Sequence, residues 1–257
     1  MKTNSTTPIL RALFCAAALI PQLSQPLSAQ APNSTEPMGQ KFATPKPAKT
    51  LRVLLVGAGT SHDFPKYFLG ADEVTLKAAD GMDVAATPNL AEALELMKDA
   101  DVLVFSGNHD QFGTDEFQKA LHKFADARKG LVILHAGTWA HPWKGYNDRF
   151  VGGGTPGHGF GEFEVTIKDT RHDVTKGVDK TFKITDENYR FEQAKRARID
   201  VCAENAADGG KEHPSVWIVK DRKTRIVCIT LGHADAAHSN PAYKTLLTNA
   251  VNWVGGR

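Results

Sequence analysis

The sequence lacks any apolar run long enough to span a membrane. The apolar segment at 12–20 is far shorter than the about 20 residues that a transmembrane helix requires. It follows two basic residues, Lys2 and Arg11, and precedes the small residues of Leu27-Ser28-Ala29, an order typical of a secretory signal peptide. We therefore expect residues 1–29 to be a signal peptide cleaved near Ala29, the protein to be secreted or periplasmic, and no stable membrane insertion.

An excess of charge of one sign is also absent. The chain has 31 Lys and Arg against 29 Asp and Glu, and loss of Lys2 and Arg11 with the leader leaves 29 of each. A nucleic-acid-binding surface needs a basic patch, and a polybasic run would indicate a membrane surface, but the sequence has neither. The composition therefore predicts no nucleic-acid partner.

Cysteine is scarce, and of the three in the chain only Cys202 and Cys228 follow the predicted leader. Both lie in apolar, strand-like segments. An oxidising compartment would permit a disulfide between them, but spacing alone does not show that the two side chains meet. Buried free thiols are the favoured interpretation, and a disulfide stays the alternative.

The predicted folded domain begins after a proline-rich stretch. Residues 30–50 contain four prolines among polar residues and are typical of a linker, whereas 51–257 has the patterns of one α/β domain. Three continuous apolar runs, at 51–56, 102–105 and 131–134, are typical of buried parallel strands.

Helical patterns lie between these runs, and more strands follow them. Residues 90–98 have apolar residues at helical spacing, Thr114 is a predicted N-cap, and a last helix is predicted over 241–253. Further strands are expected at 163–167, 182–184, 199–202, 216–219 and 226–231. This alternation predicts an α/β fold with a mainly parallel central sheet that is covered on both faces.

The loops after the three early strands are the predicted site, because open α/β sheets bind ligands at the carboxyl ends of their strands. These loops are 57–63, 106–110 and 135–141. Gly57 and Gly59 resemble the start of a dinucleotide-binding motif, but His62 replaces its third glycine, so no nicotinamide cofactor is expected. The chain also lacks the H-E-x-x-H zinc motif and the G-x-S-x-G hydrolase motif.

Histidine is abundant where those motifs are missing. Ten histidines are present, and seven fall in glycine-rich loops: His62, His109, His135, His141, His158, His233 and His238. Loops at a sheet edge are poor places to bury a structural histidine, so a functional role is favoured. His135 stands at the exit of a buried strand, where related folds place a nucleophile, and no Cys or Ser occupies that position.

Two adjacent carboxylates follow another predicted strand. Asp186 and Glu187 lie just before Tyr189, a pattern that fits an acid–base pair or acceptors for sugar hydroxyls. An exposed acidic turn is the alternative interpretation.

These segments in this order resemble the ThuA-like, or trehalose-utilisation, family. The matching segments cover essentially all of 51–257 and are His62-Asp63, Leu134-His135-Ala136, 150–153 with His158, 172–178, 186–189, 230–234 and Trp253. The resemblance implies a three-layer, flavodoxin-like sandwich like that of class I glutamine amidotransferases, without their catalytic cysteine, so glutaminase activity is not expected. It also implies carbohydrate metabolism, with keto-sugar or disaccharide derivatives as substrates.

The favoured hypothesis is an enzyme that acts on a small-molecule carbohydrate. We expect four catalytic residues, acting as general acids and bases or as ligands of a divalent metal such as zinc: His135, His158, Glu187 and His233. The expected substrate-binding residues are His62, Asp63, Asn108, His109, Trp139, Asp186 and Tyr189.

Two other hypotheses stay open. A non-catalytic sugar-binding module would stack Trp139, Trp143 and Tyr146 on sugar rings, although packing of that loop onto the sheet explains these residues at least as well. A hydrolase would use Ser106 or Thr138 as its nucleophile with a nearby histidine.

Overall fold

The structure is a computed structural model that describes residues 41–46 and 50–257. The predicted signal peptide and most of the predicted linker lie outside these residues. Within the described ranges, no helix is both long and apolar enough to cross a membrane.

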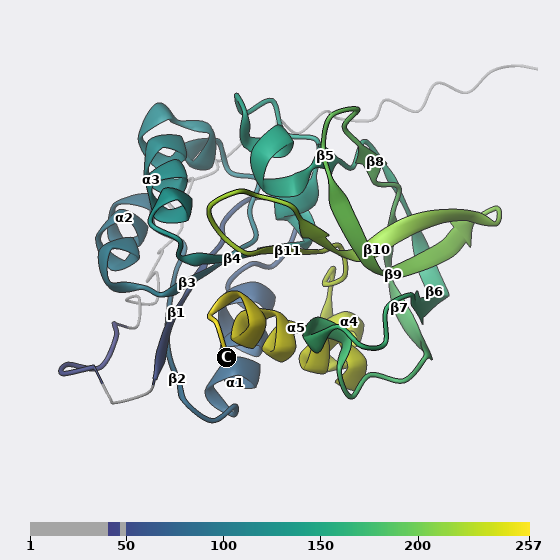
Figure 1. The fold of residues 1–257 in the computed structure, drawn as a ribbon, viewed down its shortest axis with the longest axis horizontal. Helices are drawn as coiled ribbons and strands as arrows, with labels where there is room; N and C mark the ends of the chain where they lie inside the picture. The colour runs from purple at the N-terminus through teal and green to yellow at the C-terminus, as the bar shows by residue number, and fades with distance from the viewer. Residues whose placement is uncertain (1–40, 47–49) are drawn as a thin grey trace, which may run out of the picture. The chain divides into compact units, whose positions relative to one another are not determined.

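A nine-stranded sheet forms the centre of the described domain (Figure 1). Its strands are β1 (Leu51–Val56), β2 (Met82–Thr87), β3 (Val102–Phe105), β4 (Gly130–Leu134), β6 (His158–Ile167), β7 (Thr181–Tyr189), β9 (Ile199–Asp208), β10 (Lys211–Val219) and β11 (Ile226–Ile229). Their order is β2-β1-β3-β4-β11-β10-β9-β6-β7. The strands from β2 to β11 pair in parallel, and those from β11 to β7 pair antiparallel. Strands β5 (Gly153–Gly154) and β8 (Glu192–Gln193) form a separate ribbon.

Helices cover both faces of the parallel half (Figure 1). Helices α2 (Leu90–Asp99) and α3 (Asp115–Asp126) pack on one face, and α1 (Asp72–Lys77) and α5 (Pro241–Val254) pack on the other. The short helix α4 (Asp235–Ser239) precedes α5. As the sequence predicts, Thr114 caps α3 by accepting a hydrogen bond from the Phe117 N–H. The predicted three-layer α/β fold is confirmed.

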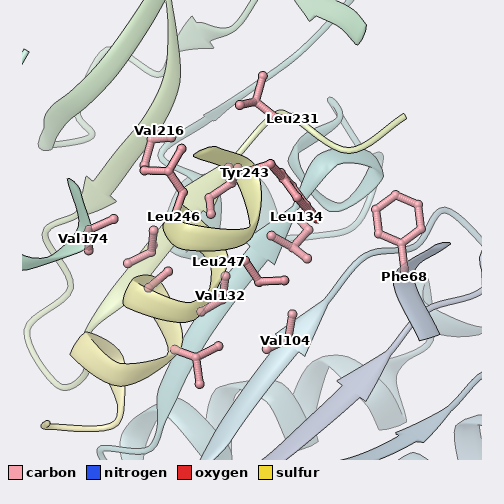
Figure 2. Close-up of a cluster of buried hydrophobic side chains, with 14 of the residues drawn as sticks. Phe68, Val104, Val132, Leu134, Val174, Val216, Leu231, Tyr243, Leu246 and Leu247 are labelled. Atoms are coloured by element: carbon pink, nitrogen blue, oxygen red, sulfur yellow. The ribbon is translucent and has the colours of Figure 1, made fainter. Parts of the chain in front are cut away.

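Alternate residues of each inner strand enter two separate cores. On β1, Val53 and Leu55 join the core beneath α1 and α5, while Leu54 joins the core beneath α2 and α3. Figure 2 shows the first core, where Leu247 of α5 lies close to Val132 of β4. Burial on both faces explains why these strands are continuous apolar runs in the sequence.

The described part of the predicted linker is packed against the domain. Phe42 is buried in the core beneath α2 and α3, and the Arg52 guanidinium lies 5.5 Å from the centre of its ring. The Ala43 N–H donates to the Asp83 carboxylate at 3.0 Å. Residues 41–46 therefore differ from the free linker expected from the prolines, because the one aromatic side chain among them finds an apolar site.

Both cysteines of the domain are buried free thiols, as the favoured interpretation predicts. Burial raises the pKa of Cys202 to about 12, and it raises the pKa of Cys228 well above its usual value. Both side chains therefore behave as small apolar groups of the core.

Candidate functional site

One carboxylate at the carboxyl ends of the parallel strands is surrounded by four imidazoles. Glu187 Oε2 lies 3.2 Å from His135 Nε2 and 3.7 Å from His62 Nε2. Its Oε1 lies 3.1 Å from His233 Nδ1 and 3.4 Å from His158 Nδ1. We call these five residues the histidine–glutamate cluster. The structure thus brings all four expected catalytic residues together and adds His62, which the sequence analysis assigns to substrate binding.

The elements of both halves of the sheet position this cluster. His62 follows β1, His135 follows β4 and His233 follows β11, so all three leave the parallel half at the same edge. Glu187 lies near the end of β7 and His158 begins β6, which is its antiparallel neighbour. The site therefore lies where β6 and β7 approach the loops that follow the parallel strands.

Glu187 stays ionised because of its neighbours. Burial is the largest single influence and raises the pKa of this carboxyl, but the hydrogen bonds with His135 and His62 and the charges of His135 and His233 together outweigh burial. The result is a pKa well below the usual range of a glutamic acid. The cluster thus contains a fixed negative charge on which the imidazoles converge.

His135 is held rigidly at the strand exit. Its side chain is fully buried, and its backbone has φ +38°, a strained value for a residue with a Cβ atom. Its Nδ1 lies 2.5 Å from the Thr230 carbonyl oxygen. A carbonyl only accepts, so Nδ1 carries the hydrogen and Nε2 faces His62 and Glu187.

Asp186 contacts the backbone next to the cluster and does not line the cavity. It is fully buried, and its carboxylate accepts hydrogen bonds from three backbone N–H groups. The donors are Glu187 at 2.8 Å, His233 at 2.9 Å and Gly232 at 2.8 Å. Its carboxylate is thus bonded to the backbone and does not line the cavity, and the substrate-binding role expected from the sequence stays a prediction.

A cavity of about 430 Å³ opens beside the cluster. Its lining residues are Ser61, His62, Asn108, Ala136, Trp139, His158, Glu187 and Tyr189. Of the expected substrate-binding residues, four line it: His62, Asn108, Trp139 and Tyr189.

Two expected substrate-binding residues lie outside this cavity and stabilise turns. Asp63 is exposed, and its carboxylate accepts from the Lys66 N–H at 3.1 Å. His109 is exposed and accepts from the Gln111 N–H at 3.1 Å. Such local bonds explain why polar residues follow a strand without facing a ligand.

Aromatic side chains border the cluster on the solvent side. Phe160 is 66% exposed, and its ring lies 5.6 Å from that of His233. The Trp139 ring lies 5.9 Å from His158. Trp143 and Tyr146, also considered for sugar stacking, are instead buried in the core beneath α2 and α3.

The other histidines predicted to lie in loops serve other contacts, and His238 lies in helix α4. His238 donates from Nδ1 to Asp72 at 2.7 Å and from Nε2 to the Gly232 carbonyl at 2.9 Å. Burial lowers the pKa of His238, but Asp72 and the Gly232 carbonyl outweigh burial and raise it overall. This buried ion pair ties the start of α1 to the loop that carries His233. His141 stacks on Trp143 with ring centres 3.9 Å apart.

The two hydroxyls considered as nucleophiles lack a base. Thr138 Oγ1 donates to the His135 carbonyl at 2.7 Å, and the Ser106 hydroxyl is buried without a hydrogen-bond partner among the described residues. Neither hydroxyl is hydrogen-bonded to an imidazole that could remove its proton.

Sequence reasoning missed Ser61, which connects two loops. Its Oγ lies 2.6 Å from His62 Nδ1 and accepts from Asn108 Nδ2 at 2.8 Å. What indicates Ser61 in the sequence is its position next to His62 in the first predicted site loop.

A family model described as trehalose utilisation, ThuA, matches residues 52–254. The chain belongs to the ThuA family. The resemblance stated from the sequence is thereby confirmed, and membership supports a role related to trehalose utilisation. No protein with curated annotation matches the chain.

Solved structures support the same fold. A ThuA-like protein from Parabacteroides merdae is 20% identical with a TM-score of 0.69, and the match covers 81% of this chain and 91% of that one. A ThuA-like protein from Bacteroides uniformis is 18% identical with a TM-score of 0.67, covering 82% and 95%. PurLQS from Thermotoga maritima is 11% identical with a TM-score of 0.54, covering 79% and 99%. These matches show a glutamine amidotransferase-like fold, and at such identities they show the fold alone.

Proposed function

We propose that this ThuA-family protein is an exported enzyme that acts on a sugar or keto-sugar derivative through proton transfer at the histidine–glutamate cluster. The observation that carries the proposal is the contact of one buried carboxylate with four imidazoles beside a cavity. The family description supports a carbohydrate substrate, and the basic and apolar leader of the sequence supports export.

His158 is the proton-transfer residue in this proposal. It lines the cavity, and its side chain is 36% exposed. Its Nδ1 lies near two acceptors, Glu187 Oε1 at 3.4 Å and the Gly159 carbonyl at 3.2 Å. A hydrogen on Nδ1 leaves Nε2 as the basic nitrogen, and the ionised Glu187 stabilises the imidazolium that forms.

The chemistry that fits is removal and return of a proton on a carbon next to a keto group. His158 takes the proton, and the keto oxygen gains negative charge. Imidazole is suited to this role because its ordinary pKa is near neutral pH. General acid–base catalysis of this kind contributes about 10²–10⁴-fold in rate.

The test is turnover of trehalose, other disaccharides and their keto derivatives, with products detected by mass spectrometry. We expect His158→Ala to lower kcat by about 100-fold or more, because it removes the proton-transfer group. Its unfolding temperature should stay near that of the wild type, since the side chain is partly exposed. His109→Ala is the matched control and should keep full activity. Undiminished turnover in His158→Ala would refute the role of this residue.

A non-catalytic sugar-binding module is the second candidate, and the exposure of Phe160 favours it. Phe160 is 66% exposed and its ring lies 5.6 Å from that of His233, so it offers a suitable surface for the apolar face of a sugar. Calorimetry with the same sugars separates the two functions. Saturable binding that weakens in Phe160→Ala, without any product, would favour the module.

A further inference from the structure

We propose that His62, His135, Glu187 and His233 bind one divalent transition-metal ion of the zinc class. This inference goes beyond proton transfer by His158, because metal binding is measured without a sugar substrate. Each of the four residues offers one ligand atom, and all four atoms lie within 4.8 Å of one another. We call these four residues the metal-site residues.

The distances match the edges of a coordination polyhedron. Zinc lies about 2.0–2.1 Å from histidine nitrogens, so neighbouring ligand atoms of a tetrahedral site are about 3.3 Å apart. His135 Nε2 lies 2.9 Å from His62 Nε2 and 3.2 Å from Glu187 Oε2. His62 Nε2 lies 3.7 Å from the same Oε2. Small side-chain shifts would place all of these atoms around one ion.

The Nε2 atom of His135 faces a second nitrogen and a carboxyl oxygen, an arrangement that a cation would stabilise. Its Nδ1 donates to the Thr230 carbonyl, so a neutral ring has a lone pair on Nε2. That lone pair points at two other groups, the His62 nitrogen and a Glu187 carboxyl oxygen. A hydrogen on His62 Nε2 would satisfy the first contact, but the His135 lone pair and the Glu187 oxygen, 3.2 Å apart, would still repel each other unless a cation lies near both.

His233 presents a second unsatisfied nitrogen to the same place. Its Nδ1 is buried and lies 3.1 Å from Glu187 Oε1, yet it is not aligned for a hydrogen bond. A buried polar atom without a partner is destabilising, so its retention points to a partner of another kind. A metal ion would satisfy this nitrogen.

An added proton is the competing explanation for the cluster. A proton on His135 Nε2 would satisfy that nitrogen and one acceptor, but it would leave His233 Nδ1 unpaired. A metal ion accepts electron pairs from all four residues at once. One metal ion therefore explains the positions of all four ligand atoms, whereas one proton explains only the contact of His135.

The ligand set selects the class of metal. Three imidazoles and one carboxylate suit zinc and neighbouring first-row metals, whereas magnesium and calcium prefer oxygen ligands. Ser61 and Thr230 provide the outer contacts that fix a metal-binding ring, at 2.6 Å from His62 and 2.5 Å from His135. A substrate carbonyl oxygen in the adjoining cavity would become a fifth ligand of such an ion, which would then polarise that oxygen.

The experiment uses the purified protein without a polyhistidine tag, freed of metal by chelation and dialysis. Zinc is titrated by calorimetry, and cobalt is titrated by visible absorption, which reports its coordination. We expect one ion per chain. His62→Ala and His233→Ala should each weaken binding about 100-fold or more, and Ser61→Ala by about 10-fold. His109→Ala should keep the wild-type affinity, because His109 lies outside the histidine–glutamate cluster.

Several outcomes would overturn the site. One is the lack of saturable binding of either metal, which would favour the proton. Another is equal loss of affinity in His109→Ala and His62→Ala. If the histidine variants do not fold, Ser61→Ala decides, because undiminished zinc affinity in that variant contradicts the site. Stoichiometric metal without turnover of any sugar would refute the proposed function alone, whereas full turnover by metal-free protein would overturn a catalytic metal alone.

Discussion

Replacing Asp186 by asparagine removes a charge on which three backbone groups converge. In the wild type, Oδ1 accepts from Glu187 and His233, and Oδ2 accepts from Gly232. Asparagine keeps one oxygen and puts an NH₂ group in the place of the other. If the oxygen keeps its two bonds, the NH₂ group faces the Gly232 N–H, so a donor meets a donor.

The expected loss of stability follows from these bonds. A hydrogen bond to a charged group contributes about 1.5–3 kcal/mol, and a buried donor left without an acceptor costs about 1–3 kcal/mol. Asp186→Asn should therefore lower the free energy of unfolding by about 3 kcal/mol. For a domain of this size, that corresponds to a fall in unfolding temperature of about 6–12 °C.

Urea denaturation and thermal unfolding measure the effect. Asp110→Asn is the matched control, because Asp110 is exposed at the start of a short helical turn. It should stay within about 0.5 kcal/mol of the wild type. If Asp186→Asn were as stable as this control, Asp186 would not hold the backbone of the site. A change confined to KM at unchanged stability would instead support the substrate-binding role expected from the sequence.

Two further predictions concern packing and pH. Burial lowers the pKa of His141 to about 4, so between pH 6.5 and 4 the unfolded chain binds more protons than the folded one. The contribution of His141 to the free energy of unfolding should be fully present above pH 6.5 and fall by about 3 kcal/mol as the pH drops to 4. Urea denaturation should show this loss in the wild type but not in His141→Phe. Equal pH slopes in the two proteins would contradict this. Gly130→Ala should cost about 1–3 kcal/mol in the same assay, because its Cβ would lie 2.5 Å from the Val254 carbonyl oxygen. Gly157→Ala, with only Arg190 at 3.9 Å, is the control, and equal losses would contradict the packing argument.

The inner strands could be predicted because burial on both faces leaves a plain signal. The apolar runs at 51–56, 102–105 and 131–134 match β1, β3 and β4 to within one residue. Edge strand β2 was missed, because Asp83 and two alanines make Met82–Thr87 a weak strand pattern. β6 begins five residues before its apolar core at 163, since Gly159 and Gly161 obscure its start.

The site could be predicted as a set of loops but not as a set of contacts. Strand exits identify His135 and His233 as edge residues, and the position of Glu187 after an apolar run is visible in the sequence. The separation of 52 residues between His135 and Glu187 is bridged by the order of the strands, which no local pattern contains. Likewise, the sequence does not indicate that Asp186 turns toward the backbone while its neighbour faces the cavity.

The position of the cluster between the two halves of the sheet has a consequence for folding. His62 and His135 come from the parallel half, whereas Glu187 comes from the last antiparallel strand. A chain that has formed only one half possesses some of these side chains but no site. Because such long-range pairings form late and slowly, any activity or metal affinity of the cluster should emerge only in the final step of folding. The rate at which either property recovers after dilution from denaturant would then measure the rate at which the parallel and antiparallel strands come together.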